Sequence, residues 1–289
     1  MRIGAVYPQT ELGGDPGAVK AFAQAAEELG YDHLLAYDHV LGAEHSGREP
    51  VLGGPYTEHD PFHEPLVMFG YLAGVTERIE LVTGVIILPQ RQTALVAKQA
   101  ADVDLFSGGR LRLGVGVGWN WVEYDALEVG DYWTRRGGRQ ATQIELLRKL
   151  WSGEIVEHVD ADHRVERARL HPAPGRQIPV WMGGFSPPAY ERAAGIADGF
   201  IFSGRQLDAA ADAKAAIEAR MEELGREDAS EFGFEAIMPY ANGSDRWVAD
   251  LDRWRDAGGT HATVVTMGAE LTTVDQHIDA ITSWRSATG

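Results

Sequence analysis

The chain contains no cysteine. A disulfide framework, a thiolate nucleophile and a cysteine-ligated metal site are therefore excluded. Lysine is scarce as well, and the 26 basic residues include only four lysines, Lys20, Lys98, Lys149 and Lys214. None of them follows a predicted strand, so Schiff-base chemistry at the rim of a barrel has no candidate nucleophile.

Positive charge and long apolar runs are also lacking. The formal net charge is −17, which argues against nucleic acid as a partner because phosphate backbones need a basic surface. Local arginines or backbone amides can still bind a small anion. No run approaches the ~18–20 apolar residues of a membrane helix, and the first residues have no signal-peptide pattern. We therefore expect a cytoplasmic protein with no membrane contact.

Short apolar runs alternate with helical periodicity along the whole chain, which predicts a parallel sheet with crossover helices. Eight such strands are predicted, at residues 3–6, 33–37, 80–88, 111–117, 179–182, 199–202, 232–237 and 260–265. Eight strands with crossover helices close most simply as a single (β/α)8 TIM barrel domain over residues 1–289, with insertions after strands 2 and 4. An open doubly wound sheet is the alternative.

Two segments do not fit the strand and helix pattern. Residues 41–64, after the second strand, carry four glycines, three prolines and three histidines. A loop of this length is usually functional or disordered, and its position on the rim favours a lid. Residues 153–178 are rich in charge, histidine and proline, and we expect them to form an extra hairpin.

The fourth predicted strand ends in glycines that alternate with valines and are followed by aromatic residues, reading G-V-G-V-G-W-N-W over 114–121. Glycine inside a strand usually marks the close approach of a ligand or of another backbone. The aromatic residues beyond favour a flat, partly polar ligand at this strand end. The alternative is a tight barrel corner that needs glycine only for packing.

Asp38 and His39 follow the second strand and are the best acid–base candidates. Histidine titrates near neutrality, and an adjacent acid could tune it. The alternative is a capping aspartate followed by a surface histidine at the start of the loop. Other side chains expected on the same rim include Thr83, Ser203 and Arg205.

The fifth strand is followed by Gly183, Gly184, Phe185 and Ser186, directly before a predicted helix. Backbone amides of a glycine turn at a helix N-terminus can bind an anion without any lysine. The alternative is a simple tight turn between the strand and the helix.

Several familiar sites are absent from the sequence. The glycines of 114–118 lack the third glycine of the dinucleotide motif, and there is no phosphate loop and no G-x-S-x-G elbow. His59 and His63 are four residues apart, but the Asp60-Pro61 pair between them disfavours a helical metal site. We therefore expect no metal, and an organic cofactor that carries the chemistry would explain these absences.

The run A-D-V-D-L-F-S-G-G-R-L-R-L-G-V-G-V-G-W-N-W-V-E-Y over 101–124 resembles the signature of the bacterial luciferase-like superfamily. It is most similar to the branch of deazaflavin (coenzyme F420)-dependent oxidoreductases. Supporting motifs are Y-D-H-L-L-A-Y-D-H-V, L-V-T-G-V-I-I-L-P, V-W-M-G-G and G-I-A-D-G-F, which occur in the order of the family between residues 31 and 200.

The resemblance implies a barrel with the cofactor ring at its C-terminal rim, near Asp38 and His39. It implies a non-proline cis peptide behind the ring, here at Gly84–Val85. It also implies a phosphate held by the strand-four end and the turn after strand five. The predicted cofactor-binding residues are Asp38, Thr83, Gly84, Val85, Gly116, Val117, Gly118, Asn120, Gly183, Gly184, Phe185 and Ser186.

Trp119 marks a departure from the family, because sugar-phosphate dehydrogenases of this group have an acidic glutamate at that place. A more apolar substrate is therefore expected. We predict hydride transfer between coenzyme F420 and a small, fairly apolar molecule, with His39 as proton donor. The first alternative is an FMN-dependent monooxygenase supplied by a separate reductase. More distant ones are a non-catalytic flavin-binding barrel and a metal-free hydrolase using Asp38 or Glu123. The family also implies a homodimer.

Overall fold

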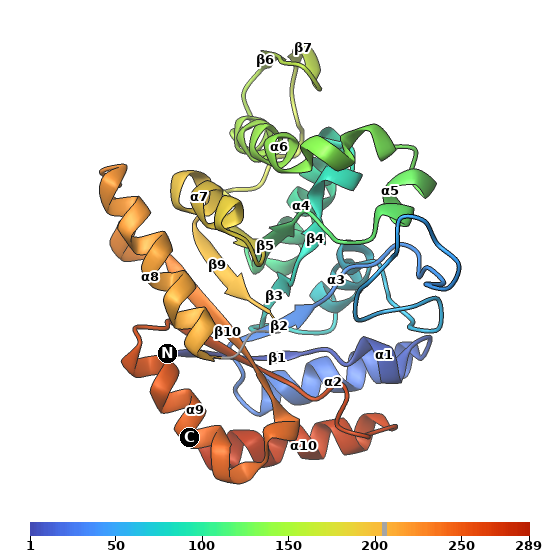
Figure 1. The fold of residues 1–289 in the computed structure, drawn as a ribbon, viewed down its shortest axis with the longest axis vertical. Helices are drawn as coiled ribbons and strands as arrows, with labels where there is room; N and C mark the ends of the chain where they lie inside the picture. Colours follow the sequence, from blue (N-terminus) through green and yellow to red (C-terminus); the bar gives the residue numbers. More distant parts are fainter. Residues whose placement is uncertain (204–206) are drawn as a thin grey trace.

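A computed structural model describes residues 1–203 and 207–289 of the chain. Its main sheet is a closed parallel barrel, because β3 pairs with β5 as well as with β2 (Figure 1). The predicted (β/α)8 barrel is confirmed, and the open doubly wound sheet is wrong. The barrel strands are β1 (Arg2–Val6), β2 (His33–Ala36), β3 (Glu80–Thr83) with β4 (Ile86–Ile87), β5 (Leu111–Gly116), β8 (Val180–Gly183), β9 (Gly199–Phe202), β10 (Gly233–Pro239) and β11 (His261–Val265).

A crossover helix follows each barrel strand and covers the outside of the sheet (Figure 1). In chain order they are α2 (Pro16–Glu28), α3 (Pro65–Ala73), α4 (Thr93–Ser107), α6 (Arg136–Trp151), α7 (Pro187–Ile196), α8 (Leu207–Glu223), α9 (Ser244–Asp256) and α10 (Val274–Thr288). Side chains define several starts, since Asp15 caps α2 and Thr273 forms a capping box with Gln276 on α10.

The third predicted strand, expected to run over 80–88, is divided into β3 and β4. The Gly84–Val85 peptide between them is cis, as the resemblance implied. Beyond this break, Ile86 and Ile87 pair with Val115 and Gly116 of β5. The segment 84–87 therefore lies directly beside the glycine-rich end of β5.

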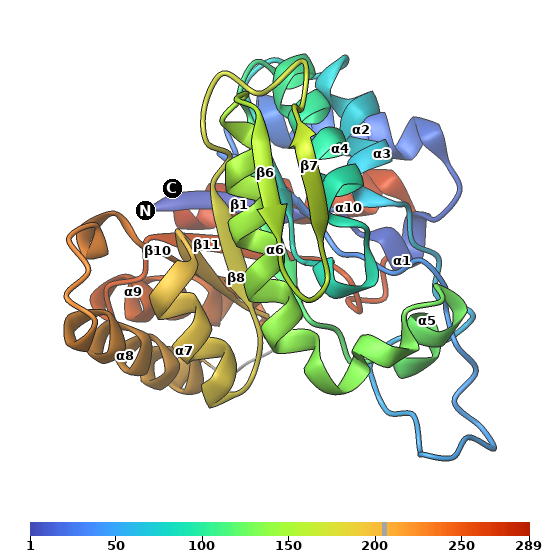
Figure 2. The ribbon, with the colours of Figure 1, turned by 90° about the horizontal axis from the view of Figure 1, so that it is seen from above.

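Both insertions are present. Residues 41–64 contain no helix or strand and lie beside the short helix α5 (Trp121–Ala126) (Figure 1). The predicted hairpin within 153–178 is confirmed as β6 (Val156–Val159) and β7 (Arg164–Ala168), an antiparallel pair. Figure 2 shows this hairpin lying across the outer side of α6. Within the described residues, no helix combines the length and the apolar character needed to span a membrane.

The barrel interior holds a buried polar network near the N-terminal ends of the strands. The Glu235 carboxylate lies 2.8 Å from His33 Nε2 and 2.6 Å from Nη1 of Arg112, and it also accepts from the Thr263 hydroxyl. Burial opposes the ionised form of Glu235, but the charges of Arg112 and His33 lower the pKa of this carboxyl well below its usual range. The network therefore buries paired charges rather than isolated ones.

His261 borders this network, where its surroundings disfavour the protonated imidazole. Burial and the positive charge of Arg112 lower the pKa of His261 to about 3, against ~6.5 in an unfolded chain. Between these values the unfolded chain binds a proton that the folded chain does not, so stability falls as the pH falls. We expect a loss of up to about 1.4 kcal/mol per pH unit from this residue between pH 6.5 and 4.

Urea unfolding of the wild type and of His261→Gln at several pH values measures this slope. The variant should lose stability less steeply below pH 6.5. His59→Gln is the control, since 85% of the His59 side chain is exposed. Equal slopes for the wild type and His261→Gln would show that His261 does not cause the acid sensitivity.

Candidate active site

Asp38 follows β2 at the C-terminal rim, where its side chain is buried. One carboxylate oxygen accepts the backbone N–H of Ile87 at 2.9 Å, and the other accepts Nη2 of Arg91 at 2.8 Å. Arg91 also binds Glu64 at the end of the 41–64 loop, at 2.7 Å. Burial raises the pKa of Asp38, while Arg91 and the Ile87 amide act against that rise. Asp38 thus joins β2, β4 and the end of the loop.

The partner of His39 is Glu123, not the adjacent Asp38. His39 Nδ1 lies 3.2 Å from Oε2 of Glu123, which is on α5. The other carboxylate oxygen accepts the backbone N–H groups of Val40 at 2.6 Å and Leu41 at 3.0 Å. The expected tuning of His39 by Asp38 is therefore corrected, since the Asp38 oxygens face Ile87 and Arg91. From the sequence, Glu123 was predicted only as a candidate residue of the hydrolase alternative.

The environment of Glu123 favours its ionised form. Burial by itself would raise the pKa of Glu123, but the hydrogen bond and charge of His39, together with the amides of Leu41 and Val40, lower it below the usual value. A carboxylate at Nδ1 fixes the imidazole orientation and leaves Nε2 as the atom that can hold or give a proton. The pair His39–Glu123 can therefore act as an oriented acid–base unit.

The 41–64 loop surrounds His39 with aromatic rings. Tyr56 and Phe62 approach the imidazole edge to face, with centroids 5.4 and 4.9 Å away. Trp119, between β5 and α5, has its ring centroid 5.5 Å from that of the His39 imidazole. The backbone of Gly54 in the loop packs directly on the Trp119 indole ring. The loop and the segment after β5 thus form an aromatic wall around the acid–base pair. That the loop opens and closes as a lid stays a prediction.

The space that side chains would occupy at the glycines of 114–118 is filled by the neighbouring segment 83–87. A Cβ atom on Gly114 would collide with the carbonyl oxygen of Thr83, one on Gly116 with Val85, and one on Gly118 would lie 2.8 Å from Ile87. These positions make room for the 83–87 segment, so the interpretation that they leave side-chain space for a ligand is corrected. On this face of the strand the glycines serve packing, as the alternative interpretation predicted.

Other predicted residues hold the rim together. The Thr83 hydroxyl donates to the Gly114 carbonyl at 2.7 Å, and the Val117 carbonyl accepts the Tyr124 hydroxyl at 2.7 Å. Asn120 caps α5 by accepting from the backbone N–H of Glu123. Through this cap, Asn120 helps to position the carboxylate that binds His39.

The turn 183–186 leads directly into α7, as predicted. Two prolines, Pro187 and Pro188, occupy the first helical positions and have no N–H to donate. The backbone donors that remain at this turn belong to Gly184, Phe185 and Ser186. Arg205, also predicted on the rim, lies outside the described residues.

Two arginines, Arg136 at the start of α6 and Arg192 on α7, were not among the predicted site residues. Arg192 on α7 approaches the start of α6, where a Cβ on Gly137 would lie 2.7 Å from its Nη1. Burial and the nearby charge of Arg136 lower the pKa of Arg192. The Nε atoms of both arginines are buried and have no hydrogen-bond partner among the described residues. Arg136 stacks on the Trp133 ring and donates from Nη1 to the Trp133 carbonyl. The two neighbouring guanidinium groups still have Nε donors without a partner among the described residues, which suits an anion.

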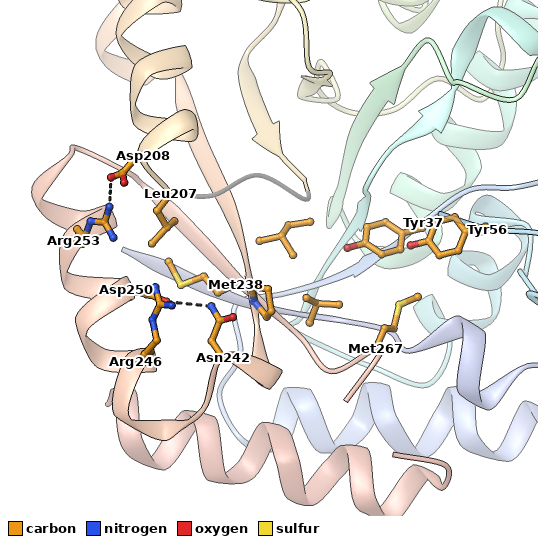
Figure 3. Close-up of a pocket in the computed structure, with 13 residues that line it drawn as sticks. Tyr37, Tyr56, Leu207, Asp208, Met238, Asn242, Arg246, Asp250, Arg253 and Met267 are labelled. Atoms are coloured by element: carbon orange, nitrogen blue, oxygen red, sulfur yellow. Dashed lines mark hydrogen bonds and ion pairs between the residues drawn. The ribbon is translucent and has the colours of Figure 1, made fainter. Parts of the chain in front are cut away.

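A cavity of about 610 Å³ opens on the same rim, above the ends of β2, β10 and β11 (Figure 3). Its inner part is apolar and includes Tyr37, Ile237, Val265 and Met267, and Tyr56 of the loop also lines it. Its outer part carries polar groups, which are the ion pairs Asp208–Arg253 and Arg246–Asp250 and the amide of Asn242. The cavity therefore combines apolar side chains with polar groups at both ends, the hydroxyls of Tyr37 and Tyr56 at one end and the ion pairs at the other (Figure 3).

Comparison with known proteins identifies relatives over most of the chain. The family model described as luciferase-like monooxygenase matches residues 1–280. An uncharacterized protein of Mycobacterium tuberculosis is 32% identical over 208 residues, 71% of each chain. The F420-dependent hydroxymycolic acid dehydrogenase of the same organism is 28% identical over 83% of this chain and 63% of its own length. The pyrimidine monooxygenase RutA of Allorhizobium ampelinum is 27% identical over 78% of this chain and 60% of its own.

Solved structures share the fold at lower sequence identity. An F420-dependent secondary alcohol dehydrogenase, solved with an F420–acetone adduct, superposes with a TM-score of 0.79 at 15% identity, covering 100% of this chain and 99% of that one. The monooxygenase RslO1 from Streptomyces bottropensis gives a TM-score of 0.76 at 17% identity, covering 98% of both chains.

Proposed function

Since this chain belongs to the luciferase-like monooxygenase family and is an oxidoreductase, we propose that it transfers a hydride between coenzyme F420 and a small, fairly apolar organic substrate. The observation that carries the proposal is the arrangement of three features on one rim. These are a cavity with an apolar inner part, an oriented His39–Glu123 pair and two arginines whose Nε atoms have no hydrogen-bond partner among the described residues.

The residues present fit such a cofactor. The inner cavity offers apolar side chains to a flat ring, and the buried Nε atoms of Arg136 and Arg192 offer donors to a phosphate or carboxylate. The amides of the turn 184–186 lie at the start of the helix that carries Arg192. A bound deazaflavin would supply a ring carbon that gives or accepts a hydride.

The chain's own groups would then handle the proton and exclude water. Glu123 holds the His39 imidazole by Nδ1, so that Nε2 can give or take the proton that accompanies hydride transfer at an oxygen-bearing carbon. Tyr56, Phe62 and Trp119 surround the ring of His39 and shield it from solvent. The apolar residues Ile237, Val265 and Met267 would orient a substrate without strong polar groups.

FMN is the second candidate cofactor, favoured by the similarity to the pyrimidine monooxygenase. A deazaflavin does not activate dioxygen as a flavin does, so the cofactor determines the reaction class. An FMN enzyme of this kind would also need reduced flavin from a separate reductase.

Titration of the purified protein with each cofactor, followed by absorbance and fluorescence, tests the proposal. We expect coenzyme F420 to bind at least about 10-fold more tightly than FMN, which corresponds to about 1.4 kcal/mol. Arg192→Gln should weaken binding by about 10-fold or more, because charge-assisted hydrogen bonds contribute about 1.5–3 kcal/mol. Arg148→Gln is the control, since Arg148 on α6 is paired with Asp198.

Two outcomes would contradict the proposal. Tight binding of FMN with no binding of coenzyme F420 would support the monooxygenase instead. Binding of neither cofactor would reopen the hydrolase alternative, in which Asp38 or Glu123 acts on water.

A further inference from the structure

The β6–β7 hairpin lies outside the barrel and buries little apolar surface of its own. Ile155, before β6, and Val159, at its end, are 62% and 65% exposed, and most residues of β7 are exposed. An isolated two-stranded hairpin is marginally stable in water. The hairpin therefore needs other contacts to stay against the helices.

Three metal-binding side chains gather at the tip of this hairpin. Nε2 of His158 lies 2.9 Å from Oδ2 of Asp160, and Nδ1 of His163 lies 3.0 Å from the same oxygen. All three ligand atoms lie within 4.8 Å of one another. The side chains of His158 and His163 are only 11% and 8% exposed, although they belong to a surface hairpin. Both imidazoles thus turn inward to one carboxylate.

The surrounding groups resemble the outer contacts of a metal site. Nε2 of His163 lies 2.7 Å from the Thr93 hydroxyl on α4. When Nδ1 of His163 binds an ion, Nε2 carries the proton and can donate it in a hydrogen bond to this hydroxyl. The other oxygen of Asp160 accepts the backbone N–H groups of Asp162 and His163, which fixes the carboxylate. Nζ of Lys149 lies 3.2 Å from Nδ1 of His158, and this half-exposed side chain also pairs with Glu145. It can move away when His158 binds an ion.

From this geometry we infer that His158, Asp160 and His163 bind a divalent transition-metal ion, which closes the tip of the hairpin and holds His163 against Thr93 of α4. Two imidazoles and one carboxylate with a free fourth position for water suit Zn²⁺. Tetrahedral bonds of about 2.1 Å separate ligand atoms by about 3.4 Å. The two histidine–aspartate distances of 2.9 and 3.0 Å therefore need to widen by only a few tenths of an ångström. The inference is independent of the cofactor proposed for the rim.

Titration of the full-length protein, first treated with EDTA and dialysed, tests the inference. Zn²⁺ binding is measured by calorimetry, and Co²⁺ is used as a probe because its visible spectrum reports nitrogen and oxygen ligands. We expect one ion per chain, with a Zn²⁺ dissociation constant of about 1 µM or tighter. His163→Ala should weaken binding by about 100-fold or more, and Thr93→Val, which keeps all three ligands, by about 10-fold.

His171→Ala is the matched control, because His171 is an exposed histidine of the same insertion. It should bind Zn²⁺ as the wild type does. Circular dichroism of the metal-free variants checks that the barrel remains folded. No uptake at about 100 µM Zn²⁺, or uptake that persists in a His158→Ala/His163→Ala double variant, would overturn the inference. The histidines would then only donate hydrogen bonds to Asp160.

Discussion

Replacing His39 by alanine is expected to lower turnover by about 100-fold or more, while the affinity for the cofactor changes only a few-fold. The reason is that a positioned proton donor contributes roughly 10²–10⁴ in rate. The imidazole is held for this task by Glu123 at 3.2 Å and by the surrounding aromatic rings. The measurement is the rate of change of cofactor absorbance with a panel of small alcohols and carbonyl compounds.

Glu123→Gln separates a positioning role from a general loss of structure. The amide can still accept the N–H groups of Val40 and Leu41, but it cannot stabilise a protonated imidazole as a carboxylate does. We expect a loss of about 10-fold to 100-fold in kcat with little change in KM. Nitrogen NMR of His39 should show that the protonation of Nδ1 changes in this variant.

Glu128→Gln is the control for the glutamate substitution, because Glu128 is an exposed glutamate just beyond α5. It should leave both kcat and KM unchanged. If His39→Ala and Glu123→Gln also turned over at the wild-type rate, the acid–base role of the pair would be disproved.

The second large effect concerns the glycine-rich strand. Gly114→Ala is expected to lower the free energy of unfolding by about 3–5 kcal/mol, at the upper end of single substitutions. The added Cβ would collide with the Thr83 carbonyl oxygen and lie 3.1 Å from Ile201. The obstacle includes backbone of the neighbouring barrel strand, so no side-chain rotation relieves it.

Gly138→Ala provides the contrast. Gly138 is on α6, and a Cβ there would meet nothing within 4 Å. Alanine at such a helix position should raise the free energy of unfolding by up to about 1 kcal/mol. Urea denaturation of both variants gives the comparison. A Gly114→Ala protein within about 1 kcal/mol of the wild type would mean that β3 and β5 can separate without cost.

The two predictions depend on contacts that sequence analysis could not assign. The pattern of glycines at 114–118 was visible, but whether they faced a ligand or a backbone was not. Closure of the barrel brings β3 beside β5, and only then does the 83–87 segment occupy the side-chain space of these glycines. Likewise, Glu123 is 84 residues from His39 in the chain, and no local pattern connects them.

Arg136 and Arg192 illustrate the same limit. Each looks like an ordinary helical arginine in the sequence. Only the packing of α6 against α7 brings the two cations together, with Nε donors that have no partner among the described residues. The adjacent turn 183–186 was recognisable because glycine before a helix has a local meaning. Its two prolines, which remove N–H donors, were also readable from the sequence.

The sequence by itself determined the barrel and the places where its rim residues stand. Local properties of the chain determine the periodicity of strands and helices, the glycines at strand ends and the long loop after β2. These properties are the hydrophobicity of each residue and its allowed backbone angles. The tertiary structure decided which side chains become partners. In the folded barrel His39 pairs with Glu123, Asp38 pairs with Arg91, and the glycines of β5 pack against the 83–87 segment. Such pairings depend on the distances between elements that are far apart in the chain, and those distances are fixed only when the barrel closes.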